Sequence, residues 1–288
     1  MRGAVHPEED AEVAVQAWDV RELWRYPVKS LGGERCDSLR LGPDGVLGDR
    51  VLAILDVESG RVLSAKRHAR MLEASASWSD AGVTIVLPDG RALRSDDGDA
   101  DGALSAWLGR AVRLVTAGEG ACVAESQPDP EDAASVGTFL LPGGRLVDEA
   151  PVHLLSTADL RAGRASYPDG AWDVRRFRPN IVLDGGGFDL DGAGPPGAVL
   201  TIGGSLLAVT GPCRRCVMVT RGQHGLAADP GILRSLARSH RASLGAYAAV
   251  LRPGEVCSGD TATAARPPAV PSGGAPGDPR LGGRVGGR

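Results

Sequence analysis

The 288-residue chain is 42% hydrophobic and contains 41 glycines and 20 prolines, a composition that supports an apolar core interrupted by many turns. Its formal net charge of −4 argues against nucleic acid as a general partner, because binding to phosphates needs a basic surface. No apolar run reaches the roughly 18 residues of a membrane-spanning helix, and the acidic N-terminus has no hydrophobic signal core, so we expect a cytoplasmic protein without a membrane partner.

Both ends of the chain are expected to be disordered. Residues 1–16 are acidic and show no apolar face, and residues 263–288 are rich in Gly and Pro with almost no bulky apolar side chains. Such segments bury too little apolar surface to offset the entropy lost when they become ordered. We therefore leave both segments out of the fold prediction.

Short β-rich runs alternate with turn signals through the middle of the chain, which favours strands over helices. We predict strands, in chain order, within residues 20–31, 50–65, 83–93, 178–187, 198–210 and 246–256. Three of these runs are expected to fold back on themselves, because each contains a turn signal: Glu58-Ser59-Gly60, Pro88-Asp89-Gly90 and Gly203-Gly204.

Helices are predicted at only three places in the chain. They lie near residues 100–110, from Ser156 onward and from Pro230 onward. Ser156 and Asp229 have short polar side chains of the kind that caps the N-terminus of a helix.

The segment that begins at Asp97 resembles the start of a calcium-binding EF-hand loop, because it has Asp at its first, third and fifth positions and Gly at its sixth. Its twelfth position is Leu108, where the ion needs a bidentate Glu. We therefore interpret this segment as an acidic turn that leads into the first helix.

The polar stretch at residues 119–136 is predicted to connect two halves of the chain. It separates two β-rich units, residues 17–118 and residues 137–262. Each unit is expected to form a curled or barrel-like sheet, with helices covering the open edges. The predicted fold class is mainly β within the α+β range, as two β-barrel-like units with a few covering helices.

Two of the five cysteines, Cys213 and Cys216, lie three positions apart in the segment GPCRRCVMVT. Five scattered cysteines are too few for a disulfide framework, so a close pair points to metal binding or catalysis. A structural zinc site needs four ligands, but the chain has no second Cys-x-x-Cys and no His-x-x-x-His. A thioredoxin-like couple needs its first Cys at the start of a helix, whereas residues 217–220 contain the β-branched side chains typical of a strand.

Two interpretations of the pair stay open from these ten residues alone. In one, a thiolate lies on or beside a strand, where the guanidinium groups of Arg214 and Arg215 favour its charged form and attract an anionic cofactor. In the other, both cysteines are small buried apolar side chains and the two arginines point to water.

Five motifs follow one another along the chain: RELWRYPVKSLGG, GVLGDRVLAILD, RRFRPNIVLDG, GPCRRCVMVT and GAYAAVLRPGEVCSGD. Over roughly residues 18–262 they resemble the MOSC family, the molybdenum cofactor sulfurase C-terminal type domains, together with the family's own N-terminal β-barrel domain. By pattern the sequence looks most like amidoxime-reducing proteins and their bacterial counterparts, which reduce N-hydroxylated compounds.

The resemblance implies a molybdenum cofactor, in which the dithiolene of a pyranopterin with a terminal phosphate holds the metal. It makes Cys216 the protein ligand of the metal, and a thiolate suits a metal that is already bound by sulfur. Cys213 is then a neighbour of the ligand. By the same resemblance, Arg214 or Arg215 would stabilise negative charge at the metal and Tyr247 would lie beside it.

Three matches are predicted to bind the cofactor phosphate. Lys29, Ser30 and Arg50 occupy the family's phosphate-binding positions, and their ammonium, hydroxyl and guanidinium groups suit phosphate oxygens. Lys66 stands where relatives often carry Arg, so this position departs from the pattern of the resemblance.

Three further matches are predicted to bind the pterin. Arg178 and Asn180 occupy the positions of the family's pterin pair, and an amide suits a pterin edge because both present donors and acceptors. Asp148 matches an acidic position that accepts hydrogen bonds from the pterin amines, although an aspartate in a turn is the alternative for this residue.

The function implied by the resemblance is the reduction of N-hydroxylated or N-oxide substrates by oxygen-atom transfer to molybdenum. Some bacterial relatives carry a C-terminal ferredoxin, but the end of this chain has no cysteine, so a separate flavin or iron–sulfur protein is expected to supply electrons. For the family as a whole the resemblance also includes pyridoxal phosphate binding. Three alternatives stay open: a cofactor carrier or sulfur-handling protein without turnover, an enzyme specialised for a nitrogen-oxygenated biosynthetic intermediate, and a metal-free interaction module.

Overall fold

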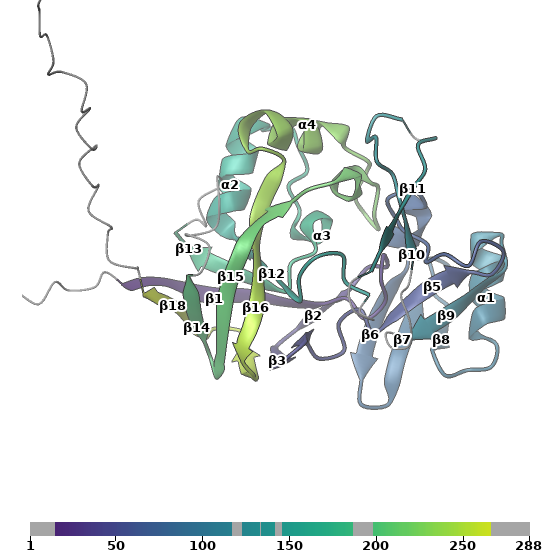
Figure 1. The fold of residues 1–288 in the computed structure, drawn as a ribbon, viewed down its shortest axis with the longest axis horizontal. Helices are drawn as coiled ribbons and strands as arrows, with labels where there is room; N and C mark the ends of the chain where they lie inside the picture. The colour runs from purple at the N-terminus through teal and green to yellow at the C-terminus, as the bar shows by residue number, and fades with distance from the viewer. Residues whose placement is uncertain (1–14, 117–122, 133, 142–145, 187–197, 266–288) are drawn as a thin grey trace, which may run out of the picture.

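The structure of the protein is a computed structural model that describes residues 15–116, 123–132, 134–141, 146–186 and 198–265. Strands make up most of its regular structure, and the few helices lie outside the sheets, as predicted from the sequence (Figure 1). No helix in these described ranges is long and apolar enough to cross a membrane.

Seven strands close into a barrel that joins the start of the chain to its C-terminal half. Around the barrel the order is β13, β12, β16, β15, β14, β18 and β1, and β1 then pairs with β13. The strands are β1 (Val15–Arg25), β12 (Val152–Ser156), β13 (Ile181–Gly185), β14 (Val199–Ile202), β15 (Ser205–Arg214), β16 (Ser243–Arg252) and β18 (Thr261–Ala265). Buried and exposed residues alternate most clearly along β15, which places every second side chain inside the barrel.

Two predicted turns are confirmed as hairpins, and the third forms less structure than expected. Gly203-Gly204 joins β14 to β15, and Gly90 lies between β7 (Gly82–Val86) and β8 (Ala92–Arg94). At Gly203 the backbone φ is 52°, and a Cβ atom would lie 2.5 Å from the Glu255 carbonyl oxygen, so this turn requires glycine. After Gly60 the chain returns along β5 (Leu52–Asp56) only through an isolated bridge.

Three helices cover one side of the barrel: α2 (Thr157–Ser166), α3 (Val174–Phe177) and α4 (Pro230–Ser239). Both predicted N-caps are confirmed. The Ser156 hydroxyl accepts a hydrogen bond from the Asp159 N–H at 3.0 Å, and the Asp159 carboxylate accepts one from the Ser156 N–H at 3.1 Å, which forms a capping box. Asp229 accepts from the Gly231 N–H at 3.0 Å and so begins α4.

A second apolar core lies beside the barrel, within smaller sheets. These contain β5 with β9 (Val112–Thr116), β7 and β8 with β6 (Ser75–Ser79), and β10 (Val123–Ser126) with β11 (Gly137–Leu140). The sheets that contain β5 and β7 pack with α1 (Ala100–Leu108) and the 3-10 helix η1 (Ala69–Glu73), whereas Ala124 of β10 lies in a separate small cluster with Ala53 and Val62. Since α1 begins directly after the turn that contains Asp97, the interpretation of that segment as an acidic turn before a helix is confirmed.

The two cores do not follow the predicted division of the chain into residues 17–118 and 137–262. β1 pairs within the barrel, β2 (Glu34–Cys36) extends it, and β3 (Ser38–Gly42) pairs with both β4 (Gly45–Val46) and β17 (Gly254–Cys257). Trp18, Leu23 and Leu41 therefore lie in the same core as residues of the C-terminal half.

The structure differs from the sequence predictions at two places and adds detail at a third. The segment 119–136, whose role as a linker stays a prediction, contains β10, which pairs with β11. Residues 217–220 form a 3-10 helix, η3 (Val217–Thr220), because burial of Val217 and Val219 against α3 and α4 outweighs their strand propensity. Residues 15–16 and 263–265, which were predicted to belong to the disordered ends, form part of β1 and β18. The rest of both predicted ends lies outside the described residues.

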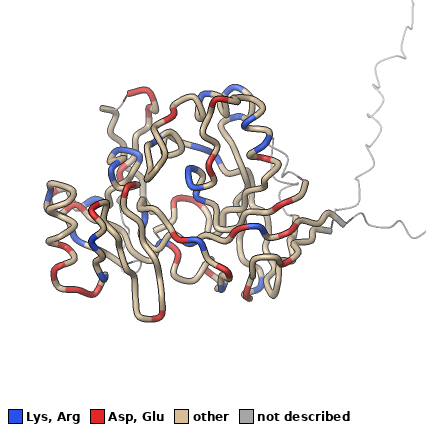
Figure 2. Tube along the Cα trace, turned by 180° about the vertical axis from the view of Figure 1, so that it is seen from behind, with Lys and Arg blue, Asp and Glu red and all other residues tan. Residues whose placement is uncertain are grey.

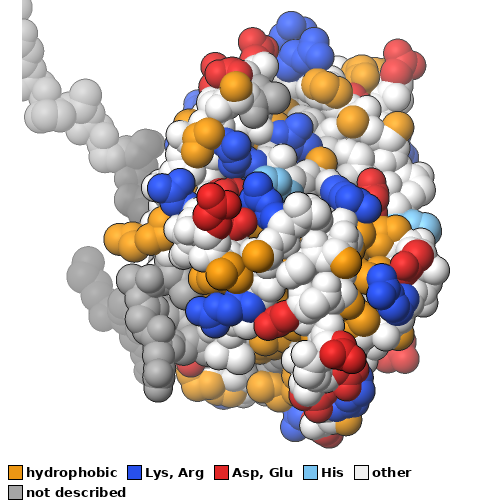
Figure 3. All heavy atoms as spheres, turned by 90° about the vertical axis from the view of Figure 1, so that its right-hand side faces the viewer, with side chains coloured by type: hydrophobic (Ala, Val, Ile, Leu, Met, Phe, Trp, Pro, Cys, Tyr) orange, Lys and Arg blue, Asp and Glu red, His pale blue; other side chains and the backbone are white. Residues whose placement is uncertain are grey.

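Charged residues of both signs are distributed over both halves of the molecule. Figure 2 shows Lys and Arg alternating with Asp and Glu along the chain trace. Figure 3, which shows the side of the molecule that carries the smaller sheets, has acidic and basic side chains interspersed with apolar ones. That face thus carries no patch of a single sign.

Candidate functional site

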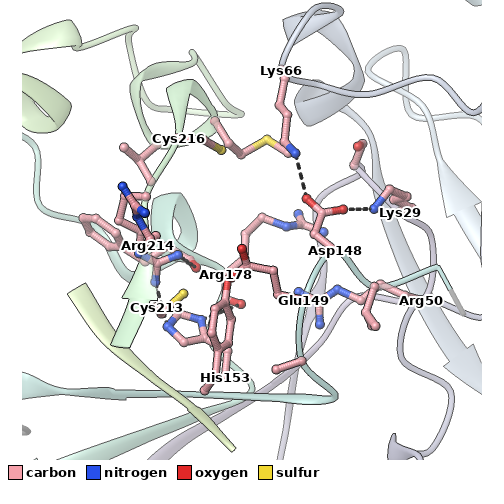
Figure 4. Close-up of a pocket in the computed structure, with 18 of the residues that line it drawn as sticks. Lys29, Arg50, Lys66, Asp148, Glu149, His153, Arg178, Cys213, Arg214 and Cys216 are labelled. Carbon is pink, nitrogen blue, oxygen red and sulfur yellow. Dashed lines mark hydrogen bonds and ion pairs between the residues drawn. The ribbon is translucent and has the colours of Figure 1, made fainter. Parts of the chain in front are cut away.

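A cavity of about 540 Å³ is lined by residues from both parts of the fold. Every residue to which the sequence assigned a role lines it: Lys29, Ser30, Arg50, Asp148, Arg178, Asn180, Arg214, Arg215, Cys216 and Tyr247. Figure 4 shows that the labelled side chains surround a common space. The structure therefore brings the predicted site together, while the role of each residue stays a prediction.

Three of the lining residues have a left-handed backbone that side chains other than glycine rarely adopt. The φ angles are 69° at Ser30, 47° at Arg50 and 54° at Arg178. Backbone hydrogen bonds hold these turns, including one of 2.8 Å from the Arg50 N–H to the Tyr26 carbonyl. Each such residue costs on the order of 1–3 kcal/mol, and such conformations concentrate at functional sites.

Asp148 joins two lysines of the cavity wall. Lys29 donates to one carboxylate oxygen, and the Lys66 ammonium donates to the other at 2.8 Å. Lys29 is buried and also donates to the Leu146 carbonyl at 3.0 Å. Burial would raise the pKa of Asp148, but the two ammonium groups outweigh it and hold that pKa well below its usual range. The carboxylate is thus charged at neutral pH.

Tyr26 separates two of the predicted cofactor-binding arginines. The guanidinium carbon of Arg178 lies 4.2 Å from the centre of its ring, and that of Arg50 lies 5.1 Å from it. Asp49 completes the group, because its carboxylate accepts from the Tyr26 N–H at 2.7 Å and from Arg50. Burial, together with the neighbouring Arg50, lowers the pKa of Arg178 to about 10, so this arginine is still charged at neutral pH.

His153 was not assigned a role from the sequence, yet it lies buried in the cavity wall. Its Nδ1 donates to the Arg178 carbonyl at 3.2 Å, and its Nε2 accepts from Arg215 at 2.6 Å, so the ring is neutral with the proton on Nδ1. Burial and the Arg215 charge both lower the pKa of His153 well below its usual value. No sequence pattern marks this residue, because a lone histidine has no characteristic spacing.

Arg215 and Asn180 form several hydrogen bonds with other residues of the protein. Besides His153, Arg215 donates to the Leu244 carbonyl at 3.0 Å and to the Phe177 carbonyl at 3.2 Å. The Asn180 amide accepts from the His153 N–H at 3.1 Å and donates to the Trp24 carbonyl at 3.3 Å. One N–H and one oxygen lone pair of Asn180 are left for a ligand.

The two cysteines lie in different surroundings. Cys213 lies on β15 and is buried, whereas Cys216 is exposed and stands at the N-cap of η3. Burial raises the pKa of the Cys213 thiol against the lowering effects of Arg215 and of a hydrogen bond with Tyr247. In the described part of the chain, no three His, Cys, Asp or Glu side chains are grouped so that they could hold a metal ion. Among the described residues, the exposed thiol therefore has no set of neighbouring side chains that would complete a protein-only metal site.

Two domain families match the chain. Residues 17–111 match the MOSC N-terminal beta barrel domain, and residues 143–263 match the MOSC domain. The chain is also 27% identical over 278 residues to a molybdenum cofactor sulfurase from Danio rerio. That match covers 79% of this chain but only 31% of the sulfurase, so the chain spans about a third of that relative's length.

Two solved structures are similar to this one at low sequence identity. The YuaD protein from Bacillus subtilis gives a TM-score of 0.47 at 11% identity, over 87% of this chain and 97% of that chain. YiiM from Geobacillus stearothermophilus gives a TM-score of 0.32 at 19% identity, over 40% of this chain and 54% of that chain.

Proposed function

The chain belongs to the MOSC domain family, and from this premise we propose that its cavity binds a molybdenum–pyranopterin cofactor with Cys216 as the protein ligand of the metal. The observation that carries the proposal is one exposed thiol on the wall of a cavity that is otherwise rich in Lys and Arg. A thiolate is a soft ligand that suits a metal already bound by sulfur, and the cations suit an anionic cofactor.

The residues present fit such a cofactor by their chemistry. Lys29, Ser30 and Arg50 supply an ammonium, a hydroxyl and a guanidinium group for a phosphate, and Arg178 extends the row of donors behind Tyr26. A net charge of −4 would repel a phosphate at long range, so these local cations are what make its binding favourable. The cavity volume of about 540 Å³ lies within the range of cofactor sites.

We further propose that the protein reduces N-hydroxylated or N-oxide compounds. In such a reaction an N–O bond breaks, and two electrons and two protons are consumed. With an N-hydroxylated compound one proton goes to the nitrogen and the other converts the hydroxyl to water, whereas with an N-oxide both protons go to the oxygen. When bound, molybdenum supplies the two-electron redox chemistry, and a separate flavin or iron–sulfur protein supplies the electrons. Arg215 is fixed by three protein hydrogen bonds, so its charge is preorganised beside the cysteine pair.

Elemental analysis beside a paired set of cysteine variants tests the proposal. Wild-type protein from a molybdate-supplied host is expected to contain about one molybdenum per chain and to reduce benzamidoxime with a reduced dye as donor. Cys216→Ala should abolish the activity, whereas Cys213→Ala should keep most of it because that thiol is buried. Metal-free wild-type protein, or equal activity of Cys216→Ala and wild type, would contradict the proposal.

A second role is favoured by the likeness to a molybdenum cofactor sulfurase. The protein would then bind the cofactor and hand it on, or handle its sulfur, without reducing a substrate. Wild-type protein that holds stoichiometric molybdenum but reduces neither benzamidoxime nor hydroxylamine with a competent donor would support this carrier role and exclude the reductase.

A further inference from the structure

The basic side chains of the cavity differ in whether they already form hydrogen bonds or ion pairs within the protein. Six of them donate to protein oxygens or to a ring nitrogen: Lys29, Arg50, Lys66, Arg176, Arg178 and Arg215. Arg214 is the exception, since its exposed side chain has no hydrogen bond or ion pair with any residue that the structure describes. Its five donors are therefore available to a ligand.

The two acidic side chains of the cavity differ in the same way. Asp148 is bound by two lysines, whereas the neighbouring Glu149 is exposed and has no hydrogen bond or ion pair within the described ranges. Glu149 nevertheless lines the same cavity as the cysteine pair, and Figure 4 shows it apart from Arg214, across the space that both residues line.

We propose that Arg214 and Glu149 recognise a dipolar substrate. Arg214 binds a carboxylate of that substrate, and Glu149 accepts hydrogen bonds from the N–H groups of its N-oxygenated end. This inference rests on the proposed function and adds the substrate class to it. Arg214 stands two positions before Cys216, and its planar guanidinium matches a carboxylate with two parallel hydrogen bonds.

The other cations are poor candidates for this task. The charges of Lys29 and Lys66 are already paired with Asp148, and a carboxylate at Arg215 would compete with contacts to two backbone carbonyls. A buried donor or acceptor that loses its partner is costly. A ligand at Arg214 breaks no contact with the described residues, so no protein interaction is lost when it binds.

Binding of product-like ligands to the molybdenum-loaded protein tests the recognition without turnover. 4-Amidinobenzoate carries both groups, benzamidine lacks the carboxylate and benzoate lacks the amidine. By isothermal titration calorimetry, wild type should bind 4-amidinobenzoate at least about 10-fold more tightly than either single-group ligand. Arg214→Ala should remove its preference over benzamidine, and Glu149→Gln its preference over benzoate.

Arg61→Ala and Glu58→Gln are matched controls, because both side chains are exposed, lie outside the cavity lining, and have no side-chain hydrogen bond within the described chain. Both controls should bind all three ligands as wild type does. Equal binding of the three ligands by wild type, or unchanged preferences in both cavity variants, would overturn the inference.

A kinetic ratio separates failure of this inference from failure of the proposed function. The ratio of kcat/KM for 4-carboxybenzamidoxime to that for benzamidoxime should exceed about 10 in wild type and fall toward 1 in Arg214→Ala. Any loss of rate common to both substrates cancels in this ratio. An enzyme inert toward both compounds would refute the reductase, and the calorimetry would still decide the recognition. Equal ratios in wild type and Arg214→Ala would refute the recognition alone.

Discussion

Replacing His153 by Gln would remove a titratable ring from the cavity wall and leave an amide that can donate and accept in its place. In the native protein the ring is neutral, because Nδ1–H donates to the Arg178 carbonyl and Nε2 accepts from Arg215. A proton on Nε2 would remove that acceptor and place a second positive charge against a guanidinium group at 2.6 Å. The stability of the wild type should therefore depend on pH through this residue.

The sign and size of this dependence follow from proton linkage. In the unfolded chain His153 has a pKa of about 6.5, whereas in the folded protein burial and then Arg215 lower that pKa well below this value. The unfolded state thus binds more protons below about pH 6.5, so the free energy of unfolding falls as pH falls. One proton corresponds to about 1.4 kcal/mol per pH unit. Between about pH 7.5 and pH 5.5 the wild type should lose about 1.4 kcal/mol more than His153→Gln.

Urea unfolding followed by tryptophan fluorescence measures this difference when both proteins are compared at several pH values and one ionic strength. Carboxyl titrations are common to both proteins and cancel in the comparison. His224→Gln is the control, because it makes the same substitution at an exposed histidine outside the cavity lining. Equal slopes for wild type and His153→Gln would mean that folding does not lower the pKa of His153, which would refute the hydrogen-bond assignment.

Three further predictions concern stability. Tyr26→Phe should not lower the free energy of unfolding in urea titrations, because it removes a buried hydroxyl that has no hydrogen-bond partner among the described residues; Tyr26→Leu removes the ring beside Arg50 and Arg178 and should cost about 2 kcal/mol. Ser156→Ala breaks the capping box and should cost about 1 kcal/mol in the same titrations, and no change would exclude the cap as a source of stability. Asp148→Asn should cost about 1–2 kcal/mol near neutral pH, a value reduced for the partial exposure of this carboxyl. Because folding lowers the pKa of Asp148, that cost should be full above about pH 4 and shrink as pH falls further, and a gap that does not change with pH would contradict it.

Local chemistry in the sequence predicted much of the regular structure. The hairpin at Gly203 and the caps at Ser156 and Asp229 depend on residues within a few positions of each other, so a short stretch of chain is enough to specify them. The closure of the barrel depends instead on pairing between β1 and β13, which lie far apart in the chain. The residues of a single strand do not determine its distant pairing partner. The sequence therefore did not show that β1, at the start of the chain, packs in one core with strands of the C-terminal half.

The sequence predicted which residues form the candidate site, but it did not predict the contacts that these residues make. Ordered motifs identified the residues that line the cavity, but they left Arg214 and Arg215 interchangeable as groups that stabilise charge. The structure separates them: Arg214 is the last residue of β15, while Arg215 lies beyond the strand end and turns to His153. The end of the strand thus separates two identical side chains, one bound by the protein and one with no hydrogen bond or ion pair to the described residues.

The cavity residues with a left-handed backbone show why the geometry of the site cannot be predicted from the types of its residues. Ser30, Arg50 and Arg178 adopt a backbone that glycine would adopt at lower cost, yet glycine would remove the hydroxyl and both guanidinium groups from the cavity wall. The surrounding fold must therefore supply the energy that keeps these three residues in place, through contacts such as the Tyr26 ring between the two arginines. A site built in this way combines residue types that motifs reveal with backbone angles that only the assembled fold determines.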